Sequence, residues 1–242
     1  MKQILLRADD LGYSEAVNYG LAKGCLGLPV SIGLMMNMPA VEHGYSLIKD
    51  KGYCLGIHTN ISVGSPVCEP EEVPSLVEAD GTFHSSKSFR SAKAELVTLE
   101  DVEKETEAQI KKFISMTGRE PEYLDVHAVF SMNFLKGVMN VAQKYGIPCS
   151  TLPIGKETMP VGNKEVKLHI NGSNEKSLYD IIDSLCDTDC MILVFHPGYV
   201  DKTIMETSSV NIQRVYDTDL MQSEVFHSFK GVELITYRDL KG

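Results

Sequence analysis

The 242-residue sequence has no uninterrupted apolar stretch that approaches the roughly 18–20 residues needed for a helix to cross a bilayer. Its first residues, MKQILLRADD, contain one lysine and a short apolar run, which is too little for a signal peptide. These two absences exclude a membrane as the expected partner. We therefore expect the protein to be cytoplasmic.

The sequence also lacks any CxxC pair. Its six cysteines are scattered, at Cys25, Cys54, Cys68, Cys149, Cys186 and Cys190. Closely paired cysteines are typical of zinc sites and redox motifs, and disulfide frameworks are typical of small secreted chains. The interpretation that fits this pattern is six reduced thiols, as expected in the cytoplasm.

An excess of basic charge is the third absence. Lys and Arg number 23 against 33 Asp and Glu, for a formal net charge of −10 and a pI of about 5.2. Proteins that hold nucleic-acid phosphates usually present a basic surface, so nucleic acid is not an expected partner. A small neutral or cationic ligand, or a metal ion, is easier to accommodate.

What the sequence does contain is an alternation of short apolar runs with helix-length segments. We predict strands at Ile4–Ala8, Ser31–Met36, Tyr53–Ile57, Tyr123–Val126, Pro148–Leu152, Val166–Ile170, Met191–Phe195 and Val232–Thr236. We predict helices at Ser14–Leu26, Ala40–Asp50, Thr98–Thr117, Ser131–Tyr145, Asn174–Cys186 and Ser208–Phe229. This pattern indicates an α/β fold with parallel strands and outer helices. About eight strands favour a (β/α) barrel over an open sheet, although irregular last connections leave its closure open.

One stretch, residues 62–95, breaks this alternation and is rich in Gly, Pro, Ser and Glu. A long irregular segment inside a compact domain is usually a lid or binding loop, and less often a disordered insert. No repeat or linker divides the chain. We therefore predict a single catalytic domain over residues 1–242, with residues 62–95 as a lid or substrate loop.

Acids and imidazoles follow four of the predicted strands. They are Asp9 and Asp10, His58, Asp125 and His127, and His196. The carboxyl ends of parallel barrel strands meet at one rim, where function gathers. One Asp with two His is a plausible ligand set for a divalent metal, and a second carboxylate and an imidazole could move protons. These residues suffice for metal-assisted hydrolysis, with purely structural histidines as the alternative.

Several motifs in the chain form an ordered set. They are RADDLGYSEAVNYG, GIHTNIS, VPSLVEADGTF, LDVHA, VFHPGY and GVELITYRDL, and they span residue 3 to about 240. Together they resemble the YdjC-like carbohydrate deacetylases, which include chitooligosaccharide deacetylase. The resemblance implies a deformed (β/α) barrel of the glycoside hydrolase/deacetylase type and removal of acetyl groups from N-acetylated sugars. It also implies a small acetylated sugar as substrate and a possible homodimer.

The resemblance also implies roles for individual residues. Asp10, His58 and His127 would bind one divalent metal ion. Asp9 would be the general base, and His196 the acid or charge stabiliser. The family is generally described with magnesium, whereas two imidazoles and one carboxylate suit zinc on ligand softness. Both metals therefore stay open.

Two departures from the family pattern affect substrate contacts. A second histidine often follows the LDVHA motif in the family, and Val129 stands at that position here. An acidic residue often follows the arginine near the last helix, and here Asp219 lies near that place after Arg214. We expect Arg214 and Asn60 to contact substrate, although Asn60 could instead shape its loop. Asp125 is expected to bind substrate or to orient an imidazole.

Two other functions remain alternatives. One is a metal-dependent sugar isomerase or phosphatase on the same barrel, and the other is a non-catalytic sugar-binding relative. The sequence contains no glycine-rich phosphate cradle of the usual kind, which counts against the first. Only the departure at Val129 favours the second.

The adjacent acids Asp9 and Asp10 carry a geometric prediction. Successive side chains on a regular strand point to opposite faces, so the two carboxylates could not share one site there. The chain is therefore predicted to bend at Asp9–Asp10, with a turn at Leu11–Gly12.

Overall fold

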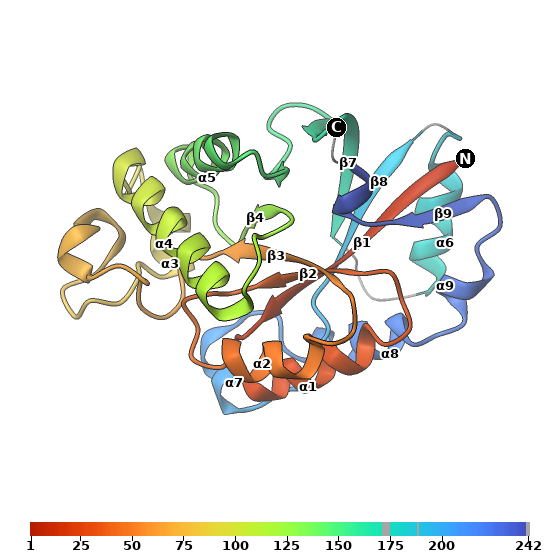
Figure 1. Cartoon of the computed structure of the whole chain (residues 1–242), viewed down its shortest axis with the longest axis horizontal. Coiled ribbons are helices and arrows are strands. Elements are labelled where there is room, and N and C mark those ends of the chain that lie inside the picture. Colours follow the sequence, from red (N-terminus) through yellow and green to blue (C-terminus); the bar gives the residue numbers. More distant parts are fainter. Residues whose placement is uncertain (171–174, 188, 241–242) are drawn as a thin grey trace.

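A computed structural model describes residues 1–170, 175–187 and 189–240, except for the side chain of residue 227 (Figure 1). Within these residues a single sheet contains every strand. The strands are β1 (Lys2–Leu11), β2 (Ser31–Leu34), β3 (Cys54–Thr59), β4 (Leu124–Val126), β5 (Cys149–Ser150), β6 (Thr158–Val161), β7 (Lys164–Ile170), β8 (Cys190–Phe195) and β9 (Val232–Ile235).

The sheet curves into a nearly closed barrel. Its strand order is β5-β4-β3-β2-β1-β8-β7-β6, and β9 pairs with the first half of β1. The end strands β5 and β6 approach each other, but in the described part of the chain they do not pair. The α/β fold class, a deformed barrel with mostly parallel strands, is therefore confirmed.

The prediction missed β6, which pairs antiparallel with β7. Val161 and Lys164 flank a two-residue turn of Gly162 and Asn163, and Gly162 has a φ of 58°. Gly-Asn between two short runs is a hairpin signal. Pro160 is tolerated in β6 because this strand lies at the edge of the sheet.

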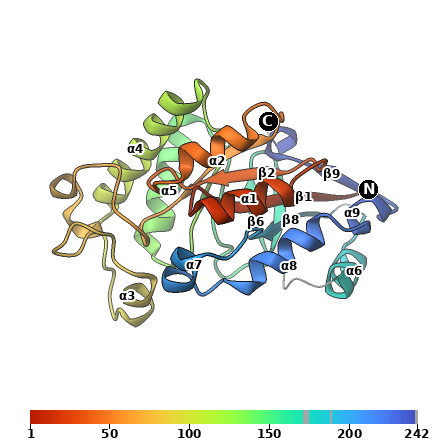
Figure 2. The ribbon, with the colours of Figure 1, turned by 90° about the horizontal axis from the view of Figure 1, so that it is seen from below.

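Helices surround the barrel (Figures 1 and 2). They are α1 (Glu15–Gly24), α2 (Val41–Ile48), α3 (Ser86–Ser91), α4 (Leu99–Thr117), α5 (Met132–Tyr145), α6 (Glu175–Ser184), α7 (Lys202–Thr207), α8 (Ile212–Met221) and α9 (Val225–Ser228). Thr98 caps α4 by accepting a hydrogen bond from the Asp101 amide, as its capping-box spacing predicts. None of the described helices has the length and apolar character needed to span a membrane.

The last helical segment differs from its prediction. A single helix over Ser208–Phe229 is wrong, because α8 and α9 are separate and α7 precedes them. Residues 208–211 form a loop, in which Ser208 Oγ and the Val210 carbonyl accept hydrogen bonds from the Arg214 guanidinium. The predicted start of α6, Asn174, lies outside the described residues.

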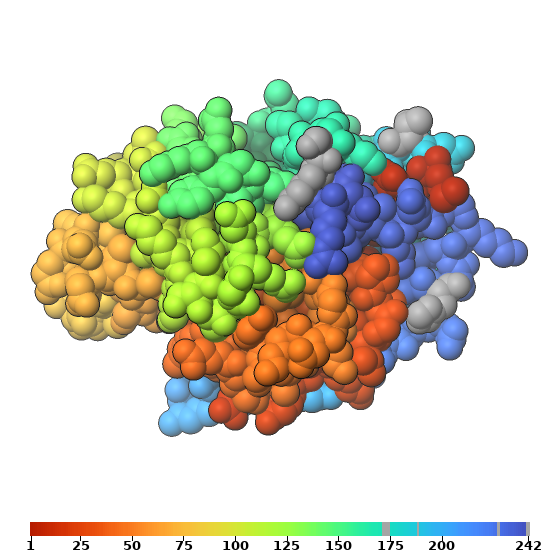
Figure 3. All heavy atoms as spheres, viewed as in Figure 1, coloured from red at the N-terminus to blue at the C-terminus, as the bar shows by residue number. Residues whose placement is uncertain are grey.

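Residues 62–95 form an irregular segment that projects at one end of the molecule (Figure 3). The segment contains two single-turn 3₁₀ helices, Pro70–Glu72 and Pro74–Leu76, and the short α3. Glu105 of α4 anchors it by accepting hydrogen bonds from the amides of Val67 and Cys68. The segment is therefore tied to the barrel at its first turn.

Helix α1 lies against the chain that follows β8. A Cβ atom on Gly20 would lie 2.4 Å from the Gly198 carbonyl carbon and 2.5 Å from the Tyr199 nitrogen. No side chain fits between these backbones, so the glycine sets how closely α1 approaches this loop. The loop begins at His196, one of the predicted site residues.

We expect Gly20→Ala to destabilise the protein by about 1–3 kcal/mol, because the added methyl group must push two backbones apart. Urea denaturation would measure this loss. Lys23→Ala, on the exposed side of the same helix, is the control and should stay within about 0.5 kcal/mol of wild type. Equal stabilities of the two variants would contradict the close packing.

Candidate active site

Strand β1 bends at the two aspartates, as predicted. Its register with β2 shifts between Ala8 and Leu11, and the φ angles of Asp10 and Gly12 are 79° and 103°. This bulge turns both Asp9 and Asp10 into one buried cluster, where each is 1% exposed. The bend therefore allows neighbouring carboxylates to serve the same site.

Three side chains converge in that cluster: Asp10 from β1, His58 from β3 and His127 from the residue after β4. Asp10 Oδ1 lies 3.3 Å from His58 Nε2 and 3.1 Å from His127 Nδ1, and the two nitrogens are 3.0 Å apart. Metal–ligand bonds of about 2.0–2.1 Å place ligand atoms roughly 2.8–3.0 Å apart at octahedral angles and roughly 3.3–3.4 Å at tetrahedral angles. The triangle fits a small divalent ion and does not select between the two geometries.

The surroundings of this triangle also fit a cation. Asp10 Oδ1 accepts no well-directed hydrogen bond among the described residues, and leaving a buried acceptor unpaired typically costs about 1–3 kcal/mol. Burial alone would raise the pKa of Asp10, but Arg214 and His127 hold it well below its usual value. The carboxylate is therefore ionised and available as a ligand.

Asp125 orients His58 from behind. Its Oδ1 lies 2.8 Å from His58 Nδ1, which turns Nε2 toward Asp10. Burial alone would lower the pKa of His58, but the carboxylates of Asp9 and Asp125 raise it well above its usual value. Without a metal, a proton on His58 supplies positive charge here, and a metal ion would displace that proton.

A second trio, formed by Asp9, His58 and Asp125, is also close enough to hold a metal. Arg7 already occupies this side of the cluster. Its guanidinium lies 2.8 Å from Asp9 Oδ2 and 2.8 Å from Asp125 Oδ2. Because this resident cation neutralises both carboxylates, the trio is an ion-pair cluster and the Asp10 triangle is the better metal site.

Sequence reasoning missed Arg7, although a signal was available. Arg7 and Asp9 are two residues apart on β1, and such residues share one face of a strand. Arg7 also donates a hydrogen bond to Ser150 Oγ, at 3.2 Å. A charged residue that is only 6% exposed in the middle of a barrel strand needs partners of this kind.

Helix α8 supplies two further buried side chains. The Arg214 guanidinium donates to Asp10 Oδ2 at 2.7 Å, and Asp217 Oδ2 accepts the backbone N–H of His196, also at 2.7 Å. Both are 1% exposed, whereas Asp219 is exposed. The acid that faces the site from this helix is therefore Asp217, three residues after Arg214 on the same face.

His196 directly follows β8, whose last residue Phe195 pairs with Ala8 of β1, so it lies beside the bulge. Burial lowers its pKa to about 4, against the opposing effect of the Asp10 and Asp9 carboxylates. The imidazole is therefore neutral near pH 7, and it can accept a proton before it can donate one. Its backbone is fixed by Asp217, so the side chain projects from a held position.

A cavity of about 370 Å³ lies over these groups, within the range of small-ligand pockets. Asp9, Asp10, His58, His127, His196 and Arg214 all line it. Ser86 and Arg90 of α3 line it from residues 62–95, and Thr207 at the end of α7 lines it together with residues 208–210 of the loop before α8. Six of the predicted residues thus meet at one pocket, and the irregular segment reaches its wall.

One predicted substrate contact is placed differently, and one departure from the family pattern lies at the cavity. Asn60 is fully buried and does not line the cavity; its amide donates to Asn37 Oδ1 and Val63 O and accepts from the Ser62 amide. It shapes its loop, which was the alternative interpretation. Val129 does line the cavity, so an aliphatic wall stands where the family often has a histidine.

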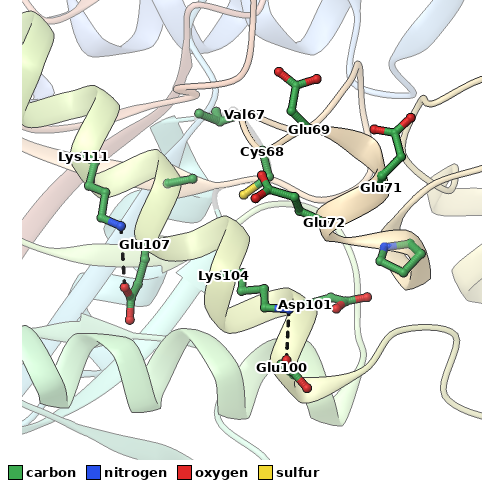
Figure 4. Close-up of a pocket in the computed structure, with 12 residues that line it drawn as sticks. Val67, Cys68, Glu69, Glu71, Glu72, Glu100, Asp101, Lys104, Glu107 and Lys111 are labelled. Carbon is green, nitrogen blue, oxygen red and sulfur yellow. Dashed lines mark ion pairs between the residues drawn. The ribbon is translucent and has the colours of Figure 1, made fainter.

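A larger hollow of about 850 Å³ lies between α4 and residues 67–74 (Figure 4). Acidic side chains dominate it, and two lysines pair within it: Lys104 with Glu100 at 2.9 Å and Lys111 with Glu107 at 4.0 Å. No predicted site residue lines this hollow. It is therefore not the candidate active site.

Comparison with known proteins places the chain in a family. The model of the YdjC-like protein family matches residues 3–230. The chain is 28% identical to a carbohydrate deacetylase of Clostridium beijerinckii (98% of this chain, 100% of that protein) and 30% identical to one of Geobacillus stearothermophilus (97% and 96%). The crystal structure of a putative cellobiose-phosphate cleavage protein from Enterococcus faecalis shares the fold, with a TM-score of 0.83 at 22% identity (100% of this chain, 99% of that one). The chain therefore belongs to the YdjC-like protein family.

Proposed function

We propose that this protein is a metal-dependent deacetylase that removes acetyl groups from small N-acetylated sugars. The observation that carries the proposal is the Asp10–His58–His127 triangle, which lies in the wall of the cavity beside Asp9 and His196. Relatives matched over nearly the whole chain are carbohydrate deacetylases. The family and the chemistry of the residues therefore lead to the same reaction.

Asp10, His58 and His127 would hold the metal ion. When bound, such an ion lowers the pKa of water and polarises a carbonyl group. Two imidazoles and one carboxylate favour zinc by ligand softness, and the family resemblance favours magnesium. Arg214 on the far oxygen of Asp10 keeps that carboxylate ionised and fixes its second oxygen.

Asp9 acts as the general base in this proposal. Arg7 holds its Oδ2 at 2.8 Å, whereas its Oδ1 has no hydrogen-bond partner among the described residues. Oδ1 is therefore the oxygen that can take a proton from the attacking water. The water oxygen forms a bond to the acetyl carbon as that proton leaves.

His196 acts on the leaving group. Because it is neutral near pH 7, it must first receive the proton that Asp9 takes from water. It then gives this proton to the sugar nitrogen as the C–N bond breaks, and the products are acetate and an amino sugar. Asp217 holds the backbone of His196 during this exchange.

The cavity suits a short sugar. Its volume of about 370 Å³ is at the lower end of the range for small-ligand pockets. Hydroxyl groups of Ser86, Thr207 and Ser209 in its lining can hydrogen-bond sugar hydroxyls, and aliphatic side chains such as Val129 can contact the acetyl methyl group. Residues 62–95 form the outer wall in this proposal.

An acetate-release screen tests the proposed function. Protein purified without chelator is incubated with N-acetylglucosamine and N,N′-diacetylchitobiose in the presence of added magnesium, zinc or other divalent ions. We expect acetate and a free amine in equal amounts. Release of phosphate from a sugar phosphate, ketose formation without acetate, or sugar binding without any product would contradict the proposal.

A further inference from the structure

One buried amide of α1 contacts the bulge that carries Asp10. Asn18 is fully buried, and its Oδ1 accepts the backbone N–H of Gly12 at 2.7 Å. Its Nδ2 donates to the Ala40 carbonyl at 2.8 Å and lies 3.1 Å from His43 Nδ1. The orientation of the amide follows from chemistry, because Gly12 N–H can only donate and the Ala40 carbonyl can only accept.

The bulge needs such a partner because its backbone is unfavourable. Asp10 is one of two non-glycine residues with positive φ among those described, and Gly12 follows it with φ of 103°. A left-handed non-glycine residue typically costs about 1–3 kcal/mol and persists only when its surroundings impose it. The Gly12 N–H lies in a buried region, where an unpaired donor would add a similar cost.

Helix α2 closes the other side of this arrangement. Figure 2 shows α1 between α2 and α8, and Asn18 faces α2. A Cβ atom on Gly44 of α2 would lie 2.7 Å from Asn18 Oδ1 and 2.9 Å from Leu11 Cγ. The Asn18 amide therefore has room only because residue 44 has no side chain, and its hydrogen bonds connect the start of α2 to the bulge.

We propose that Asn18 is a positioning residue for the metal ligand Asp10. The amide accepts a hydrogen bond from the Gly12 N–H and donates one to the Ala40 carbonyl, directly before α2. These two hydrogen bonds hold the left-handed turn that points Asp10 Oδ1 at His58 and His127. This inference rests on the proposed function, because it assigns the residue to the metal triangle. Asn18 itself touches neither the triangle nor the cavity.

Asn18→Ala tests this role through metal affinity. Val138→Ala is the matched control, because Val138 is a fully buried residue of α5 outside the cavity. Both variants lose core contacts, and both should be less stable in urea. We expect only Asn18→Ala to weaken divalent-metal binding, by tenfold or more in a calorimetric titration of chelator-stripped protein.

Gly44→Ala provides a second variant that leaves Asn18 in place. Its added methyl group would press on Asn18 Oδ1, whereas the same change at Gly137 of α5 would press on Val102 Cγ1 at 2.4 Å, far from the bulge. We expect Gly44→Ala to weaken metal binding several-fold and Gly137→Ala to leave it unchanged. This pair keeps the test decisive if Asn18→Ala does not fold.

The outcomes separate the two proposals. Suppose that wild type binds metal and releases acetate, and that Asn18→Ala and Gly44→Ala both bind metal within twofold of wild type. The role of Asn18 is then overturned and the proposed function stands. If wild type binds no divalent ion, both are overturned. If all four variants, the two controls included, bound metal more weakly than wild type, the loss of affinity would follow from lower overall stability. That result would also overturn the role of Asn18.

Discussion

Replacing Asp9 by Asn should abolish turnover and leave the metal in place. Asp9 lies beside the triangle but contributes none of its three ligand atoms. The amide has almost the same shape but cannot accept a proton from water at neutral pH. We therefore expect the rate of acetate release to fall by about 10²–10⁴-fold, with metal content still near one ion per chain by elemental analysis.

His58→Ala is the contrasting variant. It removes one ligand atom of the triangle, so metal content and activity should be lost together. The Asp9→Asn protein must also unfold cooperatively in urea, which excludes loss of structure as the cause. Full activity in Asp9→Asn, or loss of its metal, would show that Asp9 does not have the role of base.

Replacing Arg7 by Met should strongly destabilise the fold. Arg7 is 6% exposed and pairs at 2.8 Å with Asp9 and with Asp125, which are themselves buried. Burial alone would lower the pKa of Arg7, but these carboxylates raise it well above its usual value, so it stays charged. Removing it leaves two buried carboxylates without their cation, for which we expect a loss of about 3–5 kcal/mol in urea denaturation.

Lys104→Met is the control for this loss. Lys104 pairs with Glu100 on the surface of α4, where both side chains are exposed. Such a pair contributes at most about 1 kcal/mol. If Arg7→Met were no less stable than Lys104→Met, the two carboxylates would have another source of compensation, and the role assigned to Arg7 would be wrong.

Periodicity and strand ends predicted most of the architecture. The order of strands and helices, the cap at Thr98, and the rim position of the acids and imidazoles all depend on local pattern. The bend at Asp9–Asp10 also followed, because two adjacent carboxylates can share a site only where the strand is irregular.

Partners from distant segments were beyond this reasoning. Arg7 contacts Asp125 only because β1 and β4 belong to the same barrel and both side chains point into it. Asp217 contacts the His196 backbone only because α8 packs against the loop that begins at His196. Asn60 looked like a substrate contact because it lies two residues after His58. Its amide is instead used by Asn37 and Val63, which are close only in the fold.

Reconstitution of metal-free protein tests whether deacetylation depends on a metal ion in the Asp10–His58–His127 triangle. Protein stripped with chelator is titrated with a divalent ion while acetate release from N,N′-diacetylchitobiose is measured. We expect no release without metal and full release at about one equivalent of ion per chain. Undiminished acetate release by the stripped protein, or no release with any added ion, would contradict this expectation.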